Sequence, residues 1–333
     1  MEEKYKISVI VPIYNTEKYI QKCVCSLMEQ TLDGIEYIFV NDATPDNSIK
    51  ILQDVICKYP LRKDDCIILH HNENRGLATA RNTGLEKAKG KYIYHCDSDD
   101  FLETYMLEKL YNVATDKDLD VVYCDFYMDY SDRVVPYNAV DYDENKIEFL
   151  KNYITYGWNV VWNTLVRRDI YKANSLYSYD GYNFCEDYGL MCRVMYYGNS
   201  FFHLKEPLYH YNRANNNSLV KMQWNKEKKY INANSEIHIN SLIIDFFKAK
   251  GIYKDLKKQL LWRMLHAKTV FLESGRNRKQ YMTIYPEANI YINSNPLCSR
   301  KIKIYQRLMC VSTLSWLLDI LNLIEGFYHK ITK

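Results

Sequence analysis

The chain has 333 residues, of which 47% are hydrophobic and 26% charged, as is usual for a globular protein with a sizeable core. The formal net charge of +3 is too small to indicate nucleic acid as the main partner. No apolar run reaches the roughly 18 residues of a membrane span, and nothing at Met1 reads as a signal peptide. Cys23 and Cys25 lack the C-x-x-C spacing of zinc or redox motifs, so we expect a reduced, cytoplasmic protein.

Residues 7–96 alternate between apolar strands and amphipathic helices. The first strand begins at Ile7 and is apolar on both faces, as in the centre of a parallel sheet. We expect it to end at Pro12, which has no N–H for the ladder. The elements expected after it are a helix capped by Asn15 or Thr16, a strand over 36–40, a helix over 49–59, a strand over 66–70, a helix over 77–88 and a strand over 91–96. This alternation predicts a parallel sheet with right-handed crossovers and helices on both faces.

The last of these strands runs directly into an acidic stretch. Asp97, Asp99 and Asp100 place three carboxylates within four residues, where they repel one another. One interpretation is a solvated acidic turn. The other is a site for a hard cation, because Mg²⁺ and Mn²⁺ prefer oxygen ligands and share them with substrate phosphates.

Other polar residues also follow predicted strands. Ligands of open α/β sheets bind outside the carboxyl ends of the strands, so Tyr14, Asp42, Arg75 and Asp97 are expected at one edge. A dinucleotide-dependent oxidoreductase is the rival by fold, but no G-x-G-x-x-G follows the first strand and the chain has no Walker-type loop. A carboxylate-rich edge with Arg75 and Arg81 nearby suits a metal-bound diphosphate.

The second half of this region has weaker patterns. A helix is expected over 103–114 and a strand over 121–127. Residues 128–147 are mostly polar, and this pattern predicts either a segment that extends away from the sheet on the acceptor side or a mobile loop. Glu186 and Asp187 form a second acidic cluster at the start of an amphipathic helix. Acids are favoured at that end by the helix dipole, which is the structural alternative to a functional role.

Four segments together resemble one known family. Residues 11–15, 40–46, 74–84 and 97–100 are similar, in order and spacing, to the motifs of the family 2 glycosyltransferases, a large inverting family with the GT-A fold. The resemblance covers roughly residues 6–218. It implies an α/β fold with a Rossmann-like, mostly parallel, nucleotide-sugar-binding sheet in residues 1–220, followed by a mainly helical region in residues 221–333.

The resemblance also implies which residues bind a nucleotide-sugar donor. Tyr14 and Glu17 would line the nucleoside pocket, and Asp42 would accept a hydrogen bond from the base. Asp97 would face the ribose or the donor, and Arg81 would lie near the phosphates or support the acidic turn. The remaining positions expected at the donor are Pro12, Asn15, Asn74, Arg75 and Ser98.

Metal and catalytic roles follow from the same resemblance. Asp99, with Asp97, would hold the Mn²⁺ or Mg²⁺ that bridges the diphosphate. His210 lies in residues 207–213, which resemble the closing strand of the family, and is either a third metal ligand or a packed histidine. Asp187 would be the general base, with Glu186 beside it.

The C-terminal region is expected to be helical over 224–250, 254–274 and 300–333. The last segment is apolar and begins with Arg300, Lys301, Lys303 and Arg307. Such a segment packs within the chain, binds a second copy, or lies at a membrane surface. The protein would then be cytoplasmic, or peripheral at the inner face of the membrane.

Together with these patterns, the resemblance implies a metal-dependent inverting glycosyltransferase. It would move a sugar from a nucleotide diphosphate sugar, with UDP expected, to a hydroxyl of a glycan or lipid-linked acceptor in cell-surface polysaccharide synthesis. One alternative is a nucleotidyltransferase that makes activated sugars, although residues 11–15 lack the Gly-rich loop it would need. The other is a non-catalytic subunit that binds sugar nucleotides.

Overall fold

The computed structural model describes residues 4–215 and 226–331. The chain divides into two compact units: a sheet unit of Met1–Phe149 with Gly157–Ser218, and a helical unit of Leu150–Tyr156 with Leu219–Lys333. Residue 220, the expected boundary, lies outside the described residues. Residues 150–156 belong to the helical unit, although the sequence pattern assigned them to the sheet domain.

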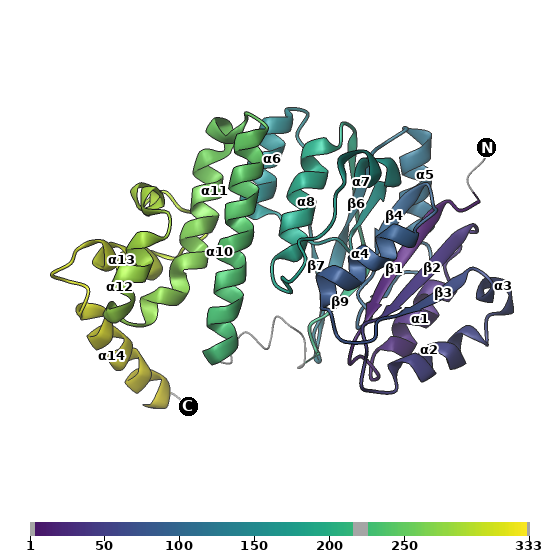
Figure 1. Ribbon diagram of the computed structural model, residues 1–333, viewed down its shortest axis with the longest axis horizontal. Coiled ribbons are helices and arrows are strands. Elements are labelled where there is room, and N and C mark those ends of the chain that lie inside the picture. The colour runs from purple at the N-terminus through teal and green to yellow at the C-terminus, as the bar shows by residue number, and fades with distance from the viewer. Residues whose placement is uncertain (1–3, 216–225, 332–333) are drawn as a thin grey trace. The chain divides into compact units, whose positions relative to one another are not determined.

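The described part of the sheet unit contains one nine-stranded sheet, in the order β3-β2-β1-β4-β8-β6-β9-β5 with β7 against β6 (Figure 1). Strands β3, β2, β1 and β4 are parallel, as predicted. Strand β8 runs antiparallel to both β4 and β6, so the sheet as a whole is mixed. The strands are β1 (Ile7–Ile13), β2 (Ile35–Asn41), β3 (Cys66–His70), β4 (Tyr92–His95), β5 (Phe101–Leu102), β6 (Val121–Asp129), β7 (Val134–Tyr137), β8 (Thr164–Arg167) and β9 (Phe201–Asn212).

Helices cover the sheet through their apolar faces. Helix α1 buries Cys23, Val24 and Leu27 against β1 and β2, whose inward side chains form the same core. The helices of this unit are α1 (Ile20–Met28), α2 (Ser48–Ile56), α3 (Pro60–Lys63), α4 (Leu77–Lys87), α5 (Met106–Asp116), α7 (Arg168–Asn174) and α8 (Glu186–Tyr197), while α6 (Lys146–Tyr156) is shared between the units.

The expected end of β1 at Pro12 is wrong by one residue. Pro12 pairs with Val40 in the parallel ladder to β2. The carbonyl of Ile10 accepts from Cys96 N on the β4 side, whereas that of Ile13 accepts from Asp42 N on the β2 side. By this alternation Pro12 points its nitrogen toward β4, where the ladder has already ended, so its missing N–H costs no hydrogen bond.

The expected helix cap at Asn15 or Thr16 is also wrong. Helix α1 begins at Ile20, because the preceding N–H groups donate to the loop after β2: Asn15 N to Thr44 Oγ1 (2.7 Å), Thr16 N to Ser48 Oγ (3.1 Å) and Glu17 N to Asp46 Oδ2 (2.8 Å). These bonds join two loops that are far apart in sequence.

The polar segment 128–147 contains a strand that the sequence pattern did not predict. This strand is β7, which pairs with β6.

The helical unit packs around a second apolar cluster that includes Phe271, Tyr281 and Met309. The expected single helix over 300–333 is two helices, since residues 311–316 form a turn whose Ser315 lies against Gly275. None of the described helices is long and apolar enough to cross a membrane. The elements are α10 (Lys226–Ala249), α11 (Tyr253–Ala267), η1 (Lys268–Glu273), η2 (Gly275–Asn277), α12 (Arg278–Thr283), η3 (Pro286–Tyr291), α13 (Arg300–Cys310) and α14 (Leu317–Ile331).

Candidate functional site

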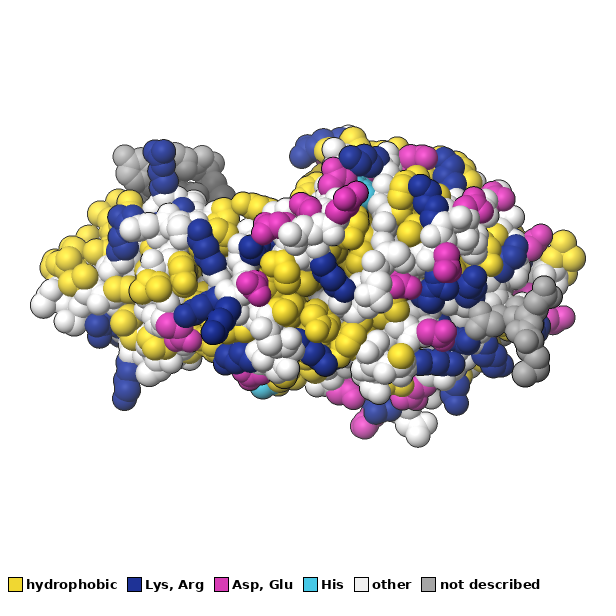
Figure 2. Space-filling view, turned by 90° about the horizontal axis from the view of Figure 1, so that it is seen from above, with side chains coloured by type: hydrophobic (Ala, Val, Ile, Leu, Met, Phe, Trp, Pro, Cys, Tyr) yellow, Lys and Arg dark blue, Asp and Glu magenta, His cyan; other side chains and the backbone are white. Residues whose placement is uncertain are grey.

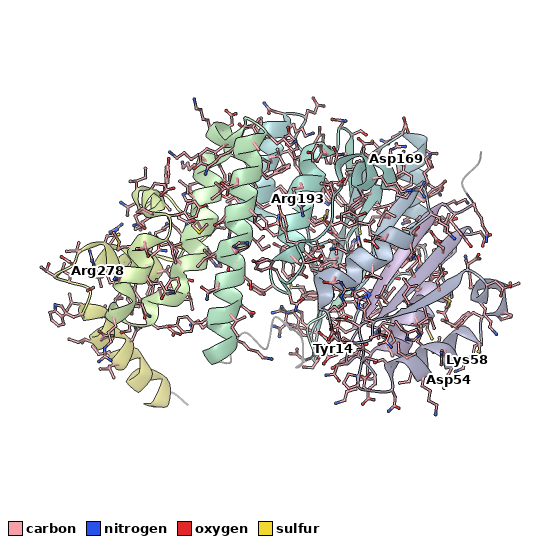
Figure 3. All side chains as sticks on the ribbon, viewed as in Figure 1. Tyr14, Asp54, Lys58, Asp169, Arg193 and Arg278 are labelled. Carbon is pink, nitrogen blue, oxygen red and sulfur yellow. The ribbon has the colours of Figure 1, made fainter. Side chains whose placement is uncertain are left out.

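The loops after β1 and β2 form one side of the predicted donor edge. Tyr14, labelled in Figure 3, follows the end of β1 with 48% of its surface exposed. Asn15 beside it has a positive φ of 56°. Glu17 Oε2 accepts from the backbone and side-chain nitrogens of Asn47, both at 3.2 Å. Of the other predicted donor residues, Pro12 and Ser98 are buried, whereas Asn74 and Arg75 are exposed.

Asp42 has a structural function that the sequence pattern did not indicate. Its buried carboxylate accepts from Arg75 N and Gly76 N, each at 2.8 Å, immediately before α4. His71 Nδ1 lies 2.7 Å from the same carboxylate. Asp42, directly after β2, therefore fixes the loop that leads into α4. A hydrogen bond to a nucleoside base at Asp42 stays a prediction.

The three carboxylates of the acidic turn have different environments. Asp100 is buried and accepts from Tyr209 Oη (2.6 Å) and from Asn212 N (2.7 Å), so it fixes the turn to β9. Asp99 accepts from Asn215 Nδ2 at 2.7 Å. Burial and then the charge of Asp97 raise the pKa of Asp99 to about 6.

Arg81 joins the acidic turn to the second acidic cluster. Its guanidinium is buried and donates to Asp97 Oδ1 (2.6 Å), Glu186 Oε1 (2.9 Å) and Asp187 Oδ1 (2.5 Å). Asp97 and Asp187, both predicted from their motifs, thus accept hydrogen bonds from the same guanidinium. This geometry fits the predicted support of the acidic turn, whereas contact of Arg81 with phosphates stays a prediction.

Glu186 and Asp187 differ in access. The side chain of Glu186 is 7% exposed and that of Asp187 is 17% exposed. Burial raises the pKa of both carboxyls above their ordinary values, and Glu186 and Asp97 raise that of Asp187 further against the opposing effect of Arg81. Asp187 is therefore the more accessible of the two acids, and an acceptor hydroxyl can reach it more readily than it can reach Glu186.

His210 lies on β9 between two carboxylates. Its Nδ1 is 3.1 Å from both oxygens of Asp129, and its Nε2 is 3.1 Å from Glu103 Oε1. The ring also stacks on Phe101 and Tyr127. A nitrogen would have to leave a carboxylate to bind a cation, so this geometry favours the packed histidine; His210 as a metal ligand stays a prediction without support here.

Sequence reasoning missed the residues that hold the acidic turn in place. Tyr209, Asn212 and Asn215 bond to Asp100 or Asp99 from more than 100 positions away. The polar side chains in this part of the sequence indicated that the residues make hydrogen bonds. Nothing in the neighbouring sequence indicated that Asp99 and Asp100 are the partners. His95 was missed as well: it is buried beside Arg81, and burial lowers its pKa to about 3, so the ring is neutral.

The carboxylate oxygens of the acidic turn suit a hard cation that also binds substrate oxygens. Within residues 4–215 and 226–331, no three His, Cys, Asp or Glu side chains converge to hold a metal by themselves. Asp97 and Asp99 nevertheless offer carboxylates, the ligands that Mg²⁺ and Mn²⁺ share with phosphates. A cation beside them would offset the repulsion that raises the pKa of Asp99.

The strand order and the acidic turn define a protein with the GT-A fold. A sequence profile described as Glycosyl transferase family 2 matches residues 8–174. The chain therefore belongs to glycosyl transferase family 2, and the predicted resemblance is confirmed.

Individual proteins show how far the likeness extends. The uncharacterized glycosyltransferase EpsJ of Bacillus subtilis is 36% identical over 230 residues, which are 66% of this chain and 64% of EpsJ. The chain thus spans less than two thirds of that relative. The structure of Staphylococcus aureus TarS 1–349 in complex with UDP-GlcNAc has a TM-score of 0.59 and 19% identity, covering 98% of this chain and 92% of the other.

A second solved structure supports the same fold. The mannosyltransferase PcManGT of Pyrobaculum calidifontis, in complex with GDP-Man and Mn²⁺, has a TM-score of 0.54 and 14% identity, covering 96% of this chain and 88% of that one. At these identities both solved structures are alike in fold. The expected GT-A fold with a helical C-terminal region is confirmed.

Proposed function

We propose that the protein is a metal-dependent inverting glycosyltransferase that uses a UDP-sugar. One observation carries this proposal: Arg81 connects the partly exposed Asp187 to Asp97 of the acidic turn, through bonds of 2.5 and 2.6 Å. A base and a donor-binding turn are therefore held in one rigid arrangement within the sheet unit. Inverting transfer requires this pairing, because the acceptor must attack the sugar on the face opposite the leaving diphosphate.

The proposed reaction is a single displacement. The acceptor hydroxyl oxygen forms a bond to the anomeric carbon, and the bond from that carbon to the diphosphate oxygen breaks with its electron pair going to UDP. The hydroxyl proton passes to the ionised carboxylate of Asp187, which Arg81 holds in place. Arg81 keeps the carboxylate in position and offsets part of the repulsion among Asp97, Glu186 and Asp187.

Asp99 and Asp97 would hold a Mn²⁺ or Mg²⁺, which when bound stabilises the charge of the departing diphosphate. The complexes of TarS with UDP-GlcNAc and of PcManGT with GDP-Man and Mn²⁺ support a nucleotide-sugar donor and a divalent cation. UDP is our choice of nucleotide. Tyr14, Asn15 and Glu17 would bind the nucleoside, with Arg75 and Asn74 exposed beside them.

The proposed acceptor is a glycan or a lipid-linked sugar in cell-surface polysaccharide synthesis. The relative GgaB of Bacillus subtilis, a minor teichoic acid biosynthesis protein, supports such a pathway. We further propose a cytoplasmic enzyme whose C-terminal helices contact a second copy or the inner face of the membrane. Family membership argues against the nucleotidyltransferase alternative, and measured sugar transfer would exclude the non-catalytic one.

A panel of labelled nucleotide sugars, incubated with lipid-linked acceptors with and without chelator, tests the reaction. Calorimetric titration with UDP tests whether a metal assists binding. The affinity for UDP should be at least about tenfold higher with Mn²⁺ than with chelator, which is a difference of about 1.4 kcal/mol in binding free energy. Asp99→Ala should remove that difference. Asp54→Ala, on the exposed surface of α2 (Figure 3), should retain it. Equal UDP affinity with and without metal in the wild type would contradict metal-assisted binding.

A further inference from the structure

Helix α14 packs on the helical unit through polar side chains. Asp319 Oδ1 accepts from Ser274 Oγ (2.7 Å) and from Gly275 N (3.3 Å). One turn later, Asn322 Nδ2 donates to the carbonyls of Leu272 (3.1 Å) and Glu273 (2.9 Å). Four directed hydrogen bonds therefore set the rotation of α14 about its axis, with Leu318 buried beside them.

The opposite face of α14 is apolar and exposed. Trp316, just before the helix, is 55% exposed, and Ile320, Leu323 and Ile324 are 43%, 66% and 50% exposed. Their spacing of four, three and one residues places them on one helical stripe. The inward face of α14 also carries apolar side chains, since Leu318 is buried and Leu321 packs against the apolar cluster of the helical unit. The exposed stripe is therefore a second apolar face, available for contact with something outside its own unit.

Basic residues accompany exposed apolar residues on α13. The helix has the sequence RKIKIYQRLMC, with four basic residues and no acidic one. Arg300, Ile304, Arg307 and, just after the helix, Val311 are exposed at a spacing of four, three and four, which again defines one face. Figure 2 shows hydrophobic and basic side chains together at the left end of the view, where Figure 1 places the C-terminal helices.

We propose that this α13–α14 surface, formed by Arg300, Ile304, Arg307, Val311, Trp316, Ile320, Leu323 and Ile324, binds an anionic lipid bilayer. The positive charge of this surface favours a bilayer over a second copy of the chain as its binding partner. Two copies that met through this surface would bring arginines against arginines, whereas an anionic bilayer can bind both the arginines and the apolar stripe. Trp316 suits the boundary between headgroups and acyl chains. The proposal deepens the membrane contact proposed above, but it does not rest on the proposed sugar transfer, because lipid binding requires no catalysis.

Co-sedimentation of the full chain with vesicles tests this surface. Vesicles containing phosphatidylglycerol should bind the wild type, vesicles of phosphatidylcholine alone should bind it much less, and added salt should weaken binding. Replacing Ile320→Ser together with Leu323→Ser should lower affinity at least about tenfold. Arg300→Glu with Arg307→Glu should lower it by about tenfold or more.

Matched controls lie on the sheet unit. Leu61→Ser removes a single apolar side chain that is 94% exposed, and Lys58→Glu reverses one exposed charge; neither should change vesicle binding. An unchanged circular dichroism spectrum and an unchanged Tm in every variant would show that the fold is intact. Wild-type binding by both α13–α14 variants would overturn the proposal. The proposal would also be overturned if the wild type did not bind vesicles but self-associated, and if these variants abolished the self-association. The surface would then be a protein interface.

Discussion

Replacing Asp187 by Asn tests the proposed base while preserving its surroundings. The amide keeps the size of the side chain and an oxygen that can accept from Arg81, whose other bonds to Glu186 (2.9 Å) and Asp97 (2.6 Å) remain. The substitution removes the negative charge of the side chain and with it the basicity. Because a positioned base contributes typically about 10²–10⁴-fold to the rate, turnover should fall by that factor.

Stability should change little, because two effects oppose each other. A hydrogen bond to a charged group contributes about 1.5–3 kcal/mol, and the neutral amide of the variant retains only part of it. Against this, burial raises the pKa of Asp187 because it disfavours the ionised carboxylate, and the substitution removes this unfavourable effect. A net change below about 1 kcal/mol should shift Tm by less than about 4 °C.

Steady-state transfer kinetics, UDP titration and thermal denaturation would be measured on Asp187→Asn and on Glu186→Gln. The Glu186 side chain is 7% exposed and also bonds Arg81, so its variant should retain more activity than Asp187→Asn. Near wild-type turnover in Asp187→Asn with an inactive Glu186→Gln would reverse the two roles. If both variants remained active, the cluster would serve only to start α8.

Two further predictions concern groups away from the reacting atoms. Lys268 is buried with its Nζ 4.0 Å from the centre of the Tyr281 ring, and burial lowers its pKa from 10.5 to about 8. The folded state then binds fewer protons than the unfolded state between these pH values, so wild-type stability should rise across that range by up to about 3 kcal/mol relative to Lys268→Met. Denaturant unfolding of both proteins at pH values on either side of the range checks this, and parallel pH profiles would refute it. Asp42→Ala should cost about 1–3 kcal/mol of unfolding free energy, since it leaves the buried N–H of Gly76 without its acceptor and removes the bond from Arg75 N; thermal denaturation equal to wild type would contradict its role in fixing the loop before α4.

Local patterns were sufficient for the regular elements and the acidic motifs. Strand β1 was predictable because a central parallel strand is buried on both faces and is therefore apolar along most of its length. Strand β3, at the edge of the sheet, is only partly buried, and its apolar residues between two helical patterns identified it. Asp97 and Asp99 were identifiable because clustered acids after a strand repel one another and need a compensating function, whereas the roles expected of Glu186 and Asp187 came from the family resemblance. The start of α8 at Glu186 followed from the amphipathic pattern of the helix.

Tertiary structure alone decided what each acid does. Asp100 and Asp99 are neighbours in sequence, yet Tyr209 and Asn212 bind the first while Asn215 binds the second, from more than 100 positions away. Likewise, the sequence of α14 predicts a helix with an apolar stripe, but Ser274 and the carbonyls before it turn that stripe outward. The physical reason is the same in both cases: periodicity and propensity act over a few residues, whereas the partner of a buried polar group is chosen by chain segments that only folding brings together.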